Sequence, residues 1–406
     1  MVAGARSPEP GGMAITETAE PLRIHDAIAL PRGVDALTAR AARSDAYTVH
    51  VVTGMRALVE RLAALVGGAS VAVITDDTVR ELYGAPLVRG LRSAGVEPLV
   101  RSVPAGEASK SLEQAIALWD WLAGSDLARR DVVVAFGGGV IADLGGWVAS
   151  GYMRGLPYVN VPTTLLAQVD GALGGKVAVN HPLAKNLLGA FHQPLGVVAD
   201  VGLLRTTTNR HLRAGLAEAI KKAIIASPAY LSFIERNADA VLARDDEALQ
   251  RLVVSAAAIK TQLIARDPYE VDLRRPLNFG HTIGHPLETV TGYGPLLHGE
   301  AVAFGMVVES RIAAARGLLD EHVLARILEL LRRCGLPTSA ADLPAVVDAD
   351  AVLVSMDKFR LIRAGSLRYV LPVAPGETVI ADDVSEAEVR RALAACGLGV
   401  ASSRQQ

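Results

Sequence analysis

DVVVAFGGGVIADLGG, from Asp131 to Gly146, joins an apolar run to a helical pattern through three consecutive glycines. A short run of mainly β-branched apolar residues is typical of a strand that is buried on both faces of a parallel sheet. Glycines between a strand and a helix let backbone amides and the helix N-terminus approach a phosphate closely. The spacing is not the G-x-G-x-x-G fingerprint, so a plain turn without a ligand stays open as the alternative.

The same alternation of strand and helix extends outward from this stretch. YTVHVVTG, SVAVITDD, EPLVRSVP and YVNVP have the pattern of strands, and helical segments such as MRALVERLAALV separate them. This order predicts an open α/β sheet, a Rossmann-like domain over residues 23–205. Asp76 ends one of the predicted strands, where its carboxylate could accept a hydrogen bond from a ribose. Residues 206–406 have mainly helical periodicity, and residues 1–22 are expected to form a disordered tail.

Composition narrows the class of partner. The net charge of -2 gives no basic surface for nucleic acid or an anionic membrane, so a small molecule is the expected ligand. The sequence has two cysteines and no apolar run long enough for a signal peptide or a membrane span, which predicts a cytoplasmic protein.

Lysine is scarce, since only seven of the 41 basic residues are lysines. In a chain that uses arginine so freely, a lysine suggests a site that needs a compact ammonium group. The seven are Lys110, Lys176, Lys185, Lys221, Lys222, Lys260 and Lys358.

Two of these lysines fall in VPTTLLAQVDGALGGKVAVNHPLAKN, from Val161 to Asn186, which is rich in hydroxyl, amide and charged groups. Its polar residues include Thr163, Thr164, Asp170, Lys176, Asn180, Lys185 and Asn186. Such a mixture suits a hydroxyl-rich, phosphorylated ligand, although a solvated loop is the alternative.

Histidines are concentrated in PLNFGHTIGHPLETVTGYGPLLHGE, from Pro276 to Glu300. His281 and His285 are four residues apart, so on a helix they would share one face, and by spacing they are the favoured metal ligands. An open metal site needs three protein ligands. Further candidates are His298, Glu288, Glu300 and the distant Glu218. The alternative is that a histidine only caps a helix or satisfies a core hydrogen bond.

GGGVIADLGG, the VPTTLL to AKN stretch, LNFGHTIGH and LHGEAVAFGM, in this order, resemble the 3-dehydroquinate synthase superfamily of sugar phosphate cyclases. The resemblance covers roughly residues 47–395. It implies an α/β N-terminal Rossmann-like domain that binds NAD and a mainly α-helical C-terminal domain that binds substrate and one Zn²⁺ or Co²⁺ ion. It also implies a homodimer acting on a phosphorylated sugar.

The resemblance further assigns site residues. It places the metal ligands on Glu218, His281 and His298, and gives His285 to the substrate instead of the metal. Catalytic positions match Lys176, Lys221, Asp170, His285, Lys260, Arg274 and Asn278. Substrate contacts match Arg154, Lys185, Asn186 and Lys358, with Arg154 reaching the phosphate from the neighbouring subunit. NAD contacts match Asp76, Glu107, Lys110, Gly138, Gly139, Asp143, Thr163, Thr164 and Thr206.

Several departures from 3-dehydroquinate synthases lie around the substrate. The chain reads DPYEVDLR before the histidine stretch, GHPLE for the usual GHAxE, AIKKAII for IKYGVI, and His211 where a glutamate is typical. The stretch DPYEVDLRRPLNFGHTIGHPLE, which contains the first two departures, is similar to sedoheptulose 7-phosphate cyclases, above all to the 2-epi-5-epi-valiolone synthases of C7-cyclitol antibiotic pathways, which are phosphate-eliminating carbon–oxygen lyases.

Lys260 and Arg274, which in dehydroquinate synthases help to hold the carboxylate side of the substrate, are nevertheless both present. Four alternatives therefore stay open: a 3-dehydroquinate synthase, a 2-epi-valiolone synthase, an iron-containing alcohol dehydrogenase and a catalytically silent regulatory homologue.

Overall fold

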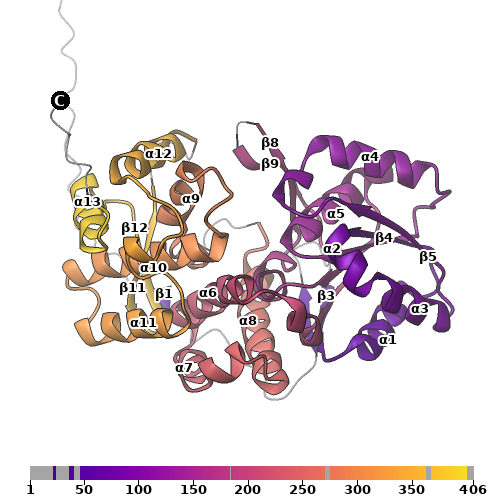
Figure 1. Cartoon of the computed structure of the whole chain (residues 1–406), viewed down its shortest axis with the longest axis horizontal. Helices are drawn as coiled ribbons and strands as arrows, with labels where there is room; N and C mark the ends of the chain where they lie inside the picture. Colours follow the sequence, from indigo (N-terminus) through magenta and orange to yellow (C-terminus); the bar gives the residue numbers. More distant parts are fainter. Residues whose placement is uncertain are drawn as a thin grey trace, which may run out of the picture.

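The computed structural model describes residues 22–23, 36–40, 46–182, 184–269, 275–362 and 367–399 (Figure 1). The predicted disordered tail, apart from Leu22, and the predicted substrate residue Arg274 lie outside the described residues.

A seven-stranded sheet forms the first half of the chain. Its strands, in spatial order, are β2 (Ala36–Arg40), β3 (Ala46–Val52), β10 (Gly196–Asp200), β7 (Tyr158–Pro162), β6 (Val132–Gly137), β4 (Val71–Asp76) and β5 (Pro98–Val103). Only β2 pairs antiparallel among these strands, and the other neighbours are parallel. The carboxyl ends of the parallel strands therefore meet at one edge, where ligands bind in open α/β sheets.

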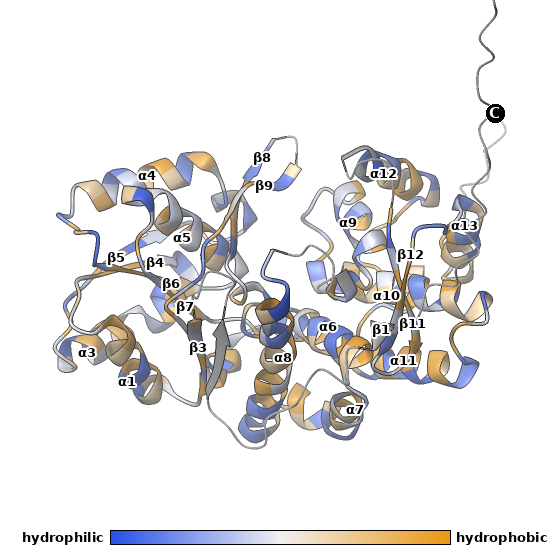
Figure 2. Cartoon of the chain, turned by 180° about the vertical axis from the view of Figure 1, so that it is seen from behind, coloured by the Kyte–Doolittle hydropathy of each residue, from blue (hydrophilic) through white to orange (hydrophobic). Residues whose placement is uncertain are grey.

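Helices cover both faces of this sheet. Val71 and Val73 of β4 pack in a core with α1 (Met55–Val66) and α3 (Ala85–Ser93). Ala72 and Ile74, which point the other way, pack with α4 (Leu112–Ala123) and α5 (Gly139–Gly151). Burial on both faces explains why these strands are mainly hydrophobic along their length (Figure 2).

The second half is mainly helical. Its helices are α6 (Asn209–Ala226), α7 (Pro228–Leu242), α8 (Asp246–Arg266), α9 (His281–Val290), α10 (His298–Ala315), α11 (Glu321–Arg333), α12 (Ala349–Ile362) and α13 (Glu386–Ala395). A small sheet completes it, with β1 (Leu22–Arg23), β12 (Glu377–Ala381) and β11 (Tyr369–Ala374) in this order. The predicted fold class, a Rossmann-like α/β half followed by a helical half, is confirmed.

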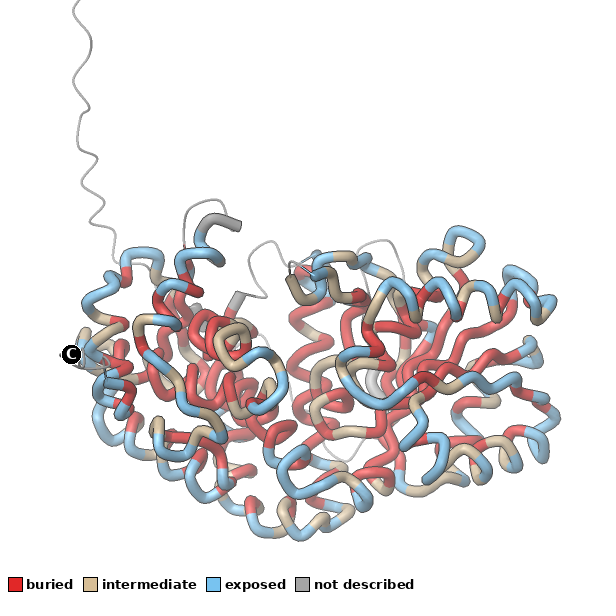
Figure 3. The backbone as a smooth tube through the Cα atoms, turned by 45° about the horizontal axis from the view of Figure 1, so that its top comes forward, coloured by how far each residue is buried: buried red, intermediate tan, exposed pale blue. Residues whose placement is uncertain are grey.

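The two halves share one hydrophobic core. Val49 and Val51 of β3 belong to the same buried cluster as Leu249 and Leu252 of α8. Helix α8 thus packs against the sheet, and buried backbone runs from the strands into the helical half (Figure 3). The division at residues 205 and 206 stays a prediction, and the short helix η6 (Val201–Thr206) leads from β10 towards α6. Among the described helices none is both long and apolar enough to cross a membrane.

Candidate active site

Three potential metal ligands converge from three helices of the second half. Glu218 lies on α6, and His281 and His298 are the first residues of α9 and α10. Oε1 of Glu218 is 3.7 Å from Nε2 of His281 and 3.8 Å from Nε2 of His298. Bonds of about 2 Å to a tetrahedral ion would bring such ligand atoms to about 3.3–3.5 Å apart. Oε1 is buried and has no hydrogen-bond partner, so the cluster fits a divalent cation.

Glu218 is oriented by two buried lysines of its own helix. Its Oε2 lies 2.6 Å from Nζ of Lys221 and 3.3 Å from Nζ of Lys222. Burial opposes ionisation, but the lysines outweigh it and hold the pKa of Glu218 below its usual value. The carboxylate is therefore charged, with one oxygen fixed by ammonium groups and the other turned towards the histidines.

Hydrogen bonds at Nδ1 fix the orientation of both histidine rings. Nδ1 of His281 donates to the carbonyl of Phe279 at 3.1 Å, and Nδ1 of His298 donates to Oε2 of Glu288 at 3.0 Å. With Nδ1 protonated, Nε2 of each ring can offer a lone pair to a metal. Burial and then Lys221 lower the pKa of His281 well below its usual value. Burial of Glu288 is outweighed by His298, and the pKa of Glu288 falls to about 2.

The close approach of α9 to α10 brings the two ligand histidines together. Gly280 precedes α9 with φ of 80°, and a Cβ there would lie 2.5 Å from the carbonyl oxygen of Val302. A Cβ at Gly305 would lie 1.9 Å from the carbonyl oxygen of Gly280. Oε2 of Glu309, further along α10, accepts a 2.9 Å hydrogen bond from the amide of Gly280. The two helices can pack this closely only because both positions lack a side chain.

Spacing favours His281 and His285 as a pair of metal ligands, but the histidines grouped with Glu218 are His281 and His298. The rings of His281 and His285 are edge to face with centroids 5.0 Å apart, and His285 belongs to a second possible ligand group with Glu288 and His298. Glu300, another candidate, forms an ion pair at 2.6 Å with Arg210 and accepts the amide of Leu297. It caps α10 and does not join the cluster of Glu218, His281 and His298.

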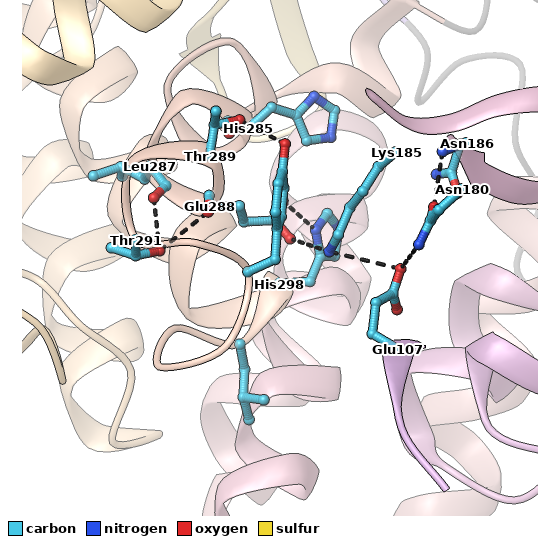
Figure 4. Close-up of polar contacts among 12 residues, drawn as sticks. Glu107, Asn180, Lys185, Asn186, His285, Leu287, Glu288, Thr289, Thr291 and His298 are labelled. Atoms are coloured by element: carbon cyan, nitrogen blue, oxygen red, sulfur yellow. Dashed lines mark hydrogen bonds and ion pairs between the residues drawn. The ribbon is translucent and has the colours of Figure 1, made fainter. Parts of the chain in front are cut away.

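A lysine from the first half reaches the histidine stretch. Lys185 lies on β9 (Ala184–Phe191), which forms a hairpin with β8 (Lys176–His181). Its Nζ is 3.6 Å from Oε1 of Glu288 and 3.8 Å from Oε1 of Glu107, between which it lies (Figure 4). It is also 4.3 Å from the ring centre of Tyr293. Lys185, a predicted substrate residue, therefore connects Glu107, which is predicted to bind NAD, with Glu288, which holds the metal-ligand candidate His298.

Lys110 organises a second polar group. Its buried ammonium donates to Asp143 of α5 and to the side chain of Asn186, which adopts a φ of 56°. The amide of Asn186 donates at 3.0 Å to Oδ1 of Asn180, whose Nδ2 donates at 2.8 Å to Glu107. Four residues of the predicted NAD and substrate sets thus form one network.

The other predicted NAD residues lie where the parallel strands end. Gly138 caps α5 after β6, and a Cβ at the neighbouring Gly139 would meet nothing within 4 Å, so a ligand could approach there. Thr163 and Thr164 follow β7 directly. Asp76 is the last residue of β4, and its Oδ1 accepts a 2.9 Å hydrogen bond from the amide of Val79. Thr206 is more distant in the chain, and its hydroxyl is 2.7 Å from that of Tyr83.

Comparison with known proteins identifies the family. The 3-dehydroquinate synthase N-terminal model matches residues 100–214, and the C-terminal model matches residues 215–358. The chain is 54% identical over 371 residues to a 2-epi-valiolone synthase of Actinosynnema mirum, covering 91% of this chain and 97% of that protein. The chain belongs to the 3-dehydroquinate synthase superfamily of sugar phosphate cyclases.

Two further relatives have different names, a 3-dehydroquinate synthase and a 2-epi-5-epi-valiolone synthase. A 3-dehydroquinate synthase of Desulforamulus reducens is 42% identical over 322 residues, which are 79% of this chain and 89% of that protein. The structure of ValA, a 2-epi-5-epi-valiolone synthase from Streptomyces hygroscopicus subsp. jinggangensis with NAD⁺ and Zn²⁺ bound, superposes with a TM-score of 0.79 at 32% identity. It covers 86% of this chain and 96% of ValA.

The remaining positions matched to the superfamily lie on several elements. Lys176 is exposed at the start of β8, Lys358 is exposed on α12, and Asn278 ends the short helix η7 (Arg275–Asn278). Arg154 is exposed on η4 (Tyr152–Arg154), with a φ of 70°. Lys260 of α8 is buried, and its Nζ is 3.0 Å from Oδ2 of Asp170.

One buried lysine of the site has no role in the superfamily assignment. Lys222 is fully buried, and its Nζ is 2.5 Å from Oδ1 of Asp170 as well as 3.3 Å from Glu218. Burial alone would lower its pKa, but the two carboxylates raise it. The adjacent Lys221 has a lowered pKa, since burial outweighs Glu218 there. The doubled lysine in a lysine-poor chain was the available signal in the sequence.

Proposed function

We propose that the chain cyclises sedoheptulose 7-phosphate to 2-epi-valiolone with release of phosphate, using bound NAD and one Zn²⁺ or Co²⁺ ion. The main support for this proposal is the cluster of Glu218, His281 and His298. In it a buried carboxylate oxygen faces two histidine nitrogens and accepts no hydrogen bond. Its occurrence in a chain 54% identical to a 2-epi-valiolone synthase supports both the reaction class and the product. The epimer 2-epi-5-epi-valiolone, which the sequence segments favour, is the product of a relative with 32% identity.

NAD when bound supplies reversible hydride transfer at a ring carbon, and the metal supplies a Lewis acid for the neighbouring oxygen. Around them, Glu218, His281 and His298 would hold the metal through Oε1 and the two Nε2 atoms. Because Nδ1 of each histidine is already committed as a donor, neither ring needs to reorient to bind the ion.

Cationic side chains would bind the phosphate and stabilise its charge as it leaves. Lys176, Lys185 and His285 are proposed for this role, and Arg154 of a second subunit is proposed to add a guanidinium. A pocket of this kind lets the departing phosphate accept the proton next to the newly formed carbonyl, so a separate general base is not required. Lys185 would exchange its ion pair with Glu288 for the substrate.

The proposed setting is a homodimer in the cytoplasm that serves C7-cyclitol biosynthesis. The two cysteines, Cys334 and Cys396, are buried free thiols, as a reducing compartment favours. Arg154 is exposed, which leaves its guanidinium accessible to a second copy.

A 3-dehydroquinate synthase is the second candidate, because Lys260 is in place beside Asp170 and a relative of that activity is 42% identical. The deciding experiment incubates the metal-loaded protein and NAD with sedoheptulose 7-phosphate or with the dehydroquinate synthase substrate, and follows phosphate release. NMR of the product distinguishes the two valiolone epimers. Turnover of only the carboxylated sugar would overturn the proposal.

A further inference from the structure

Lys222 occupies a position that the superfamily assignment does not explain. Its side chain is fully buried on α6, next to Lys221 and one helical turn from Glu218. The dehydroquinate synthases that the chain resembles commonly have tyrosine here, so the ammonium group is a departure from their pattern. An ammonium group without solvent must be compensated by carboxylates close to it.

Asp170 is the partner on which Lys222 acts most strongly. The Nζ atom is 2.5 Å from Oδ1 of Asp170 but 3.3 Å from Oε2 of Glu218. Lys221 already lies 2.6 Å from that same oxygen of Glu218. Loss of Lys222 would therefore leave the metal ligand with a close ammonium partner, while Oδ1 of Asp170 would lose its donor.

The contact also joins the two halves of the site. Asp170 lies on η5 (Ala167–Gly171), the segment that follows Thr163 and Thr164 at the end of β7. Lys222 holds Oδ1 from α6, and Lys260 holds Oδ2 at 3.0 Å and the backbone carbonyl of Asp170 at 2.8 Å from α8. The Asp170 side chain keeps 28% of its surface accessible, whereas Lys222 has none. Only the aspartate can thus meet a ligand.

We propose that Lys222 is a positioning residue that fixes the carboxylate of Asp170, and with it the segment after the predicted NAD threonines, against the helix that carries the metal ligand Glu218. This rests on the proposed function, because it takes Glu218 as a ligand and the threonines as NAD contacts. Lys222 acts through Asp170 and leaves metal affinity to Lys221.

The test compares Lys222→Met, Asp170→Asn and the double variant with the wild-type protein. Lys222→Met retains the length and helix propensity of the side chain but removes its charge. The first readout is kcat for phosphate release from sedoheptulose 7-phosphate, and the second is Co²⁺ affinity from the visible absorption of the bound ion. We expect Lys222→Met to lower kcat roughly 10- to 100-fold, as loss of an orienting partner typically does.

The double variant should have a kcat within about threefold of Asp170→Asn, because residues that act through one contact give non-additive effects. Co²⁺ affinity of Lys222→Met should stay within about threefold of wild type. Arg326→Met is the control for a loss of stability alone. It removes a cation that pairs with Glu235 at 2.5 Å, and neither residue belongs to the predicted site. It should change the melting temperature but not kcat.

Three results would overturn the role of Lys222: an unchanged kcat, multiplicative losses in the double variant, or a loss of Co²⁺ affinity that accounts for the loss of kcat. If Lys222→Met does not fold, Lys222→Gln is used with the same expected outcomes. If the wild-type protein binds Co²⁺ and turns over sedoheptulose 7-phosphate, and Lys222→Met has the same kcat and Co²⁺ affinity, only the positioning role is refuted. A wild-type protein that does neither refutes the proposed function itself.

Discussion

Oε1 of Glu218 lies 3.7 Å from Nε2 of His281, although one residue is in the middle of α6 and the other begins α9. The opposite oxygen of Glu218 is held by lysines, and the opposite nitrogen of His281 is held by a backbone carbonyl. Each side chain therefore has one polar atom committed to the protein and one directed at the other. This geometry is that of a site prepared for a cation.

Glu218→Gln should lose bound metal and activity together. The amide keeps the shape of the side chain but removes the charge that a three-ligand site needs, so we expect occupancy to fall at least tenfold. Metal content after dialysis, measured by atomic emission, checks this. Glu300→Gln is the control, because Glu300 caps α10 and pairs with Arg210. Full occupancy in Glu218→Gln would remove this residue from the ligand set.

His281→Ala and His285→Ala should separate metal binding from substrate binding. The first substitution removes a ligand nitrogen and should abolish metal retention. The second should keep the metal and raise KM for the phosphorylated sugar about tenfold or more, since a charge-assisted contact is lost. Metal content and initial rates on both proteins test the pair. Equal metal loss in the two variants would support the helical i, i+4 pairing instead.

Glu288→Gln should weaken metal binding through His298. The carboxylate of Glu288 accepts the Nδ1 proton at 3.0 Å, and its pKa of about 2 keeps it charged at any working pH. Removing such a partner typically lowers metal affinity 10- to 100-fold. Competition with a chromogenic chelator measures the change. Affinity equal to wild type would show that the hydrogen bond does not tune the ligand.

Glu309→Gln should flatten part of the pH dependence of stability. Burial raises the pKa of Glu309 well above its usual value. Hydrogen bonds from the amide of Gly280 and from other backbone donors lower this pKa, but burial outweighs them. A raised folded-state pKa gives stability that is complete below about pH 4.5 and is lost as pH rises through the folded pKa. Glutamine mimics the neutral acid, so the variant should gain stability relative to wild type as pH increases. Urea unfolding from pH 5 to 8 measures this, and a difference independent of pH would contradict it.

Arg154→Ala should impair phosphate binding in a way that a second subunit can restore. Mixing it with Glu218→Gln would create dimers in which one site has both an intact metal cluster and an intact arginine from the other chain. We expect partial recovery of activity on mixing and co-refolding, up to about a quarter of wild type for random pairing. Absence of recovery would place Arg154 in the site of its own subunit.

Five strands of the Rossmann-like half, β3, β4, β5, β6 and β7, are predicted from their short runs rich in apolar residues, whereas β2 and β10 are not. The β8–β9 hairpin is not predicted either. Lys176 to Phe191 mixes apolar residues with lysine, asparagine and histidine without a regular alternation, and Pro182 lies inside it, so the sequence does not mark two strands. The pairing of these strands depends on packing of β8 against α5, which local patterns do not contain.

The metal cluster shows a similar limit. Spacing on one helix favours His281 with His285, whereas Glu218 and His298 reach His281 only through the packing of three helices. The resemblance to the superfamily supplied this set, and the structure brings its members together. The scarcity of lysine marks Lys222 as a possible site residue, but its burial and its contact with Asp170 result from the packing of α6 against η5, which the sequence pattern does not contain.

Phosphate and absorbance at 340 nm, followed in one reaction, show whether the protein is a cyclase that uses NAD without consuming it. Wild-type protein with Co²⁺, NAD and sedoheptulose 7-phosphate should release one phosphate per sugar with no net NADH, because the hydride returns to the product. Accumulation of NADH in step with substrate loss and no free phosphate would contradict the account and indicate an alcohol dehydrogenase.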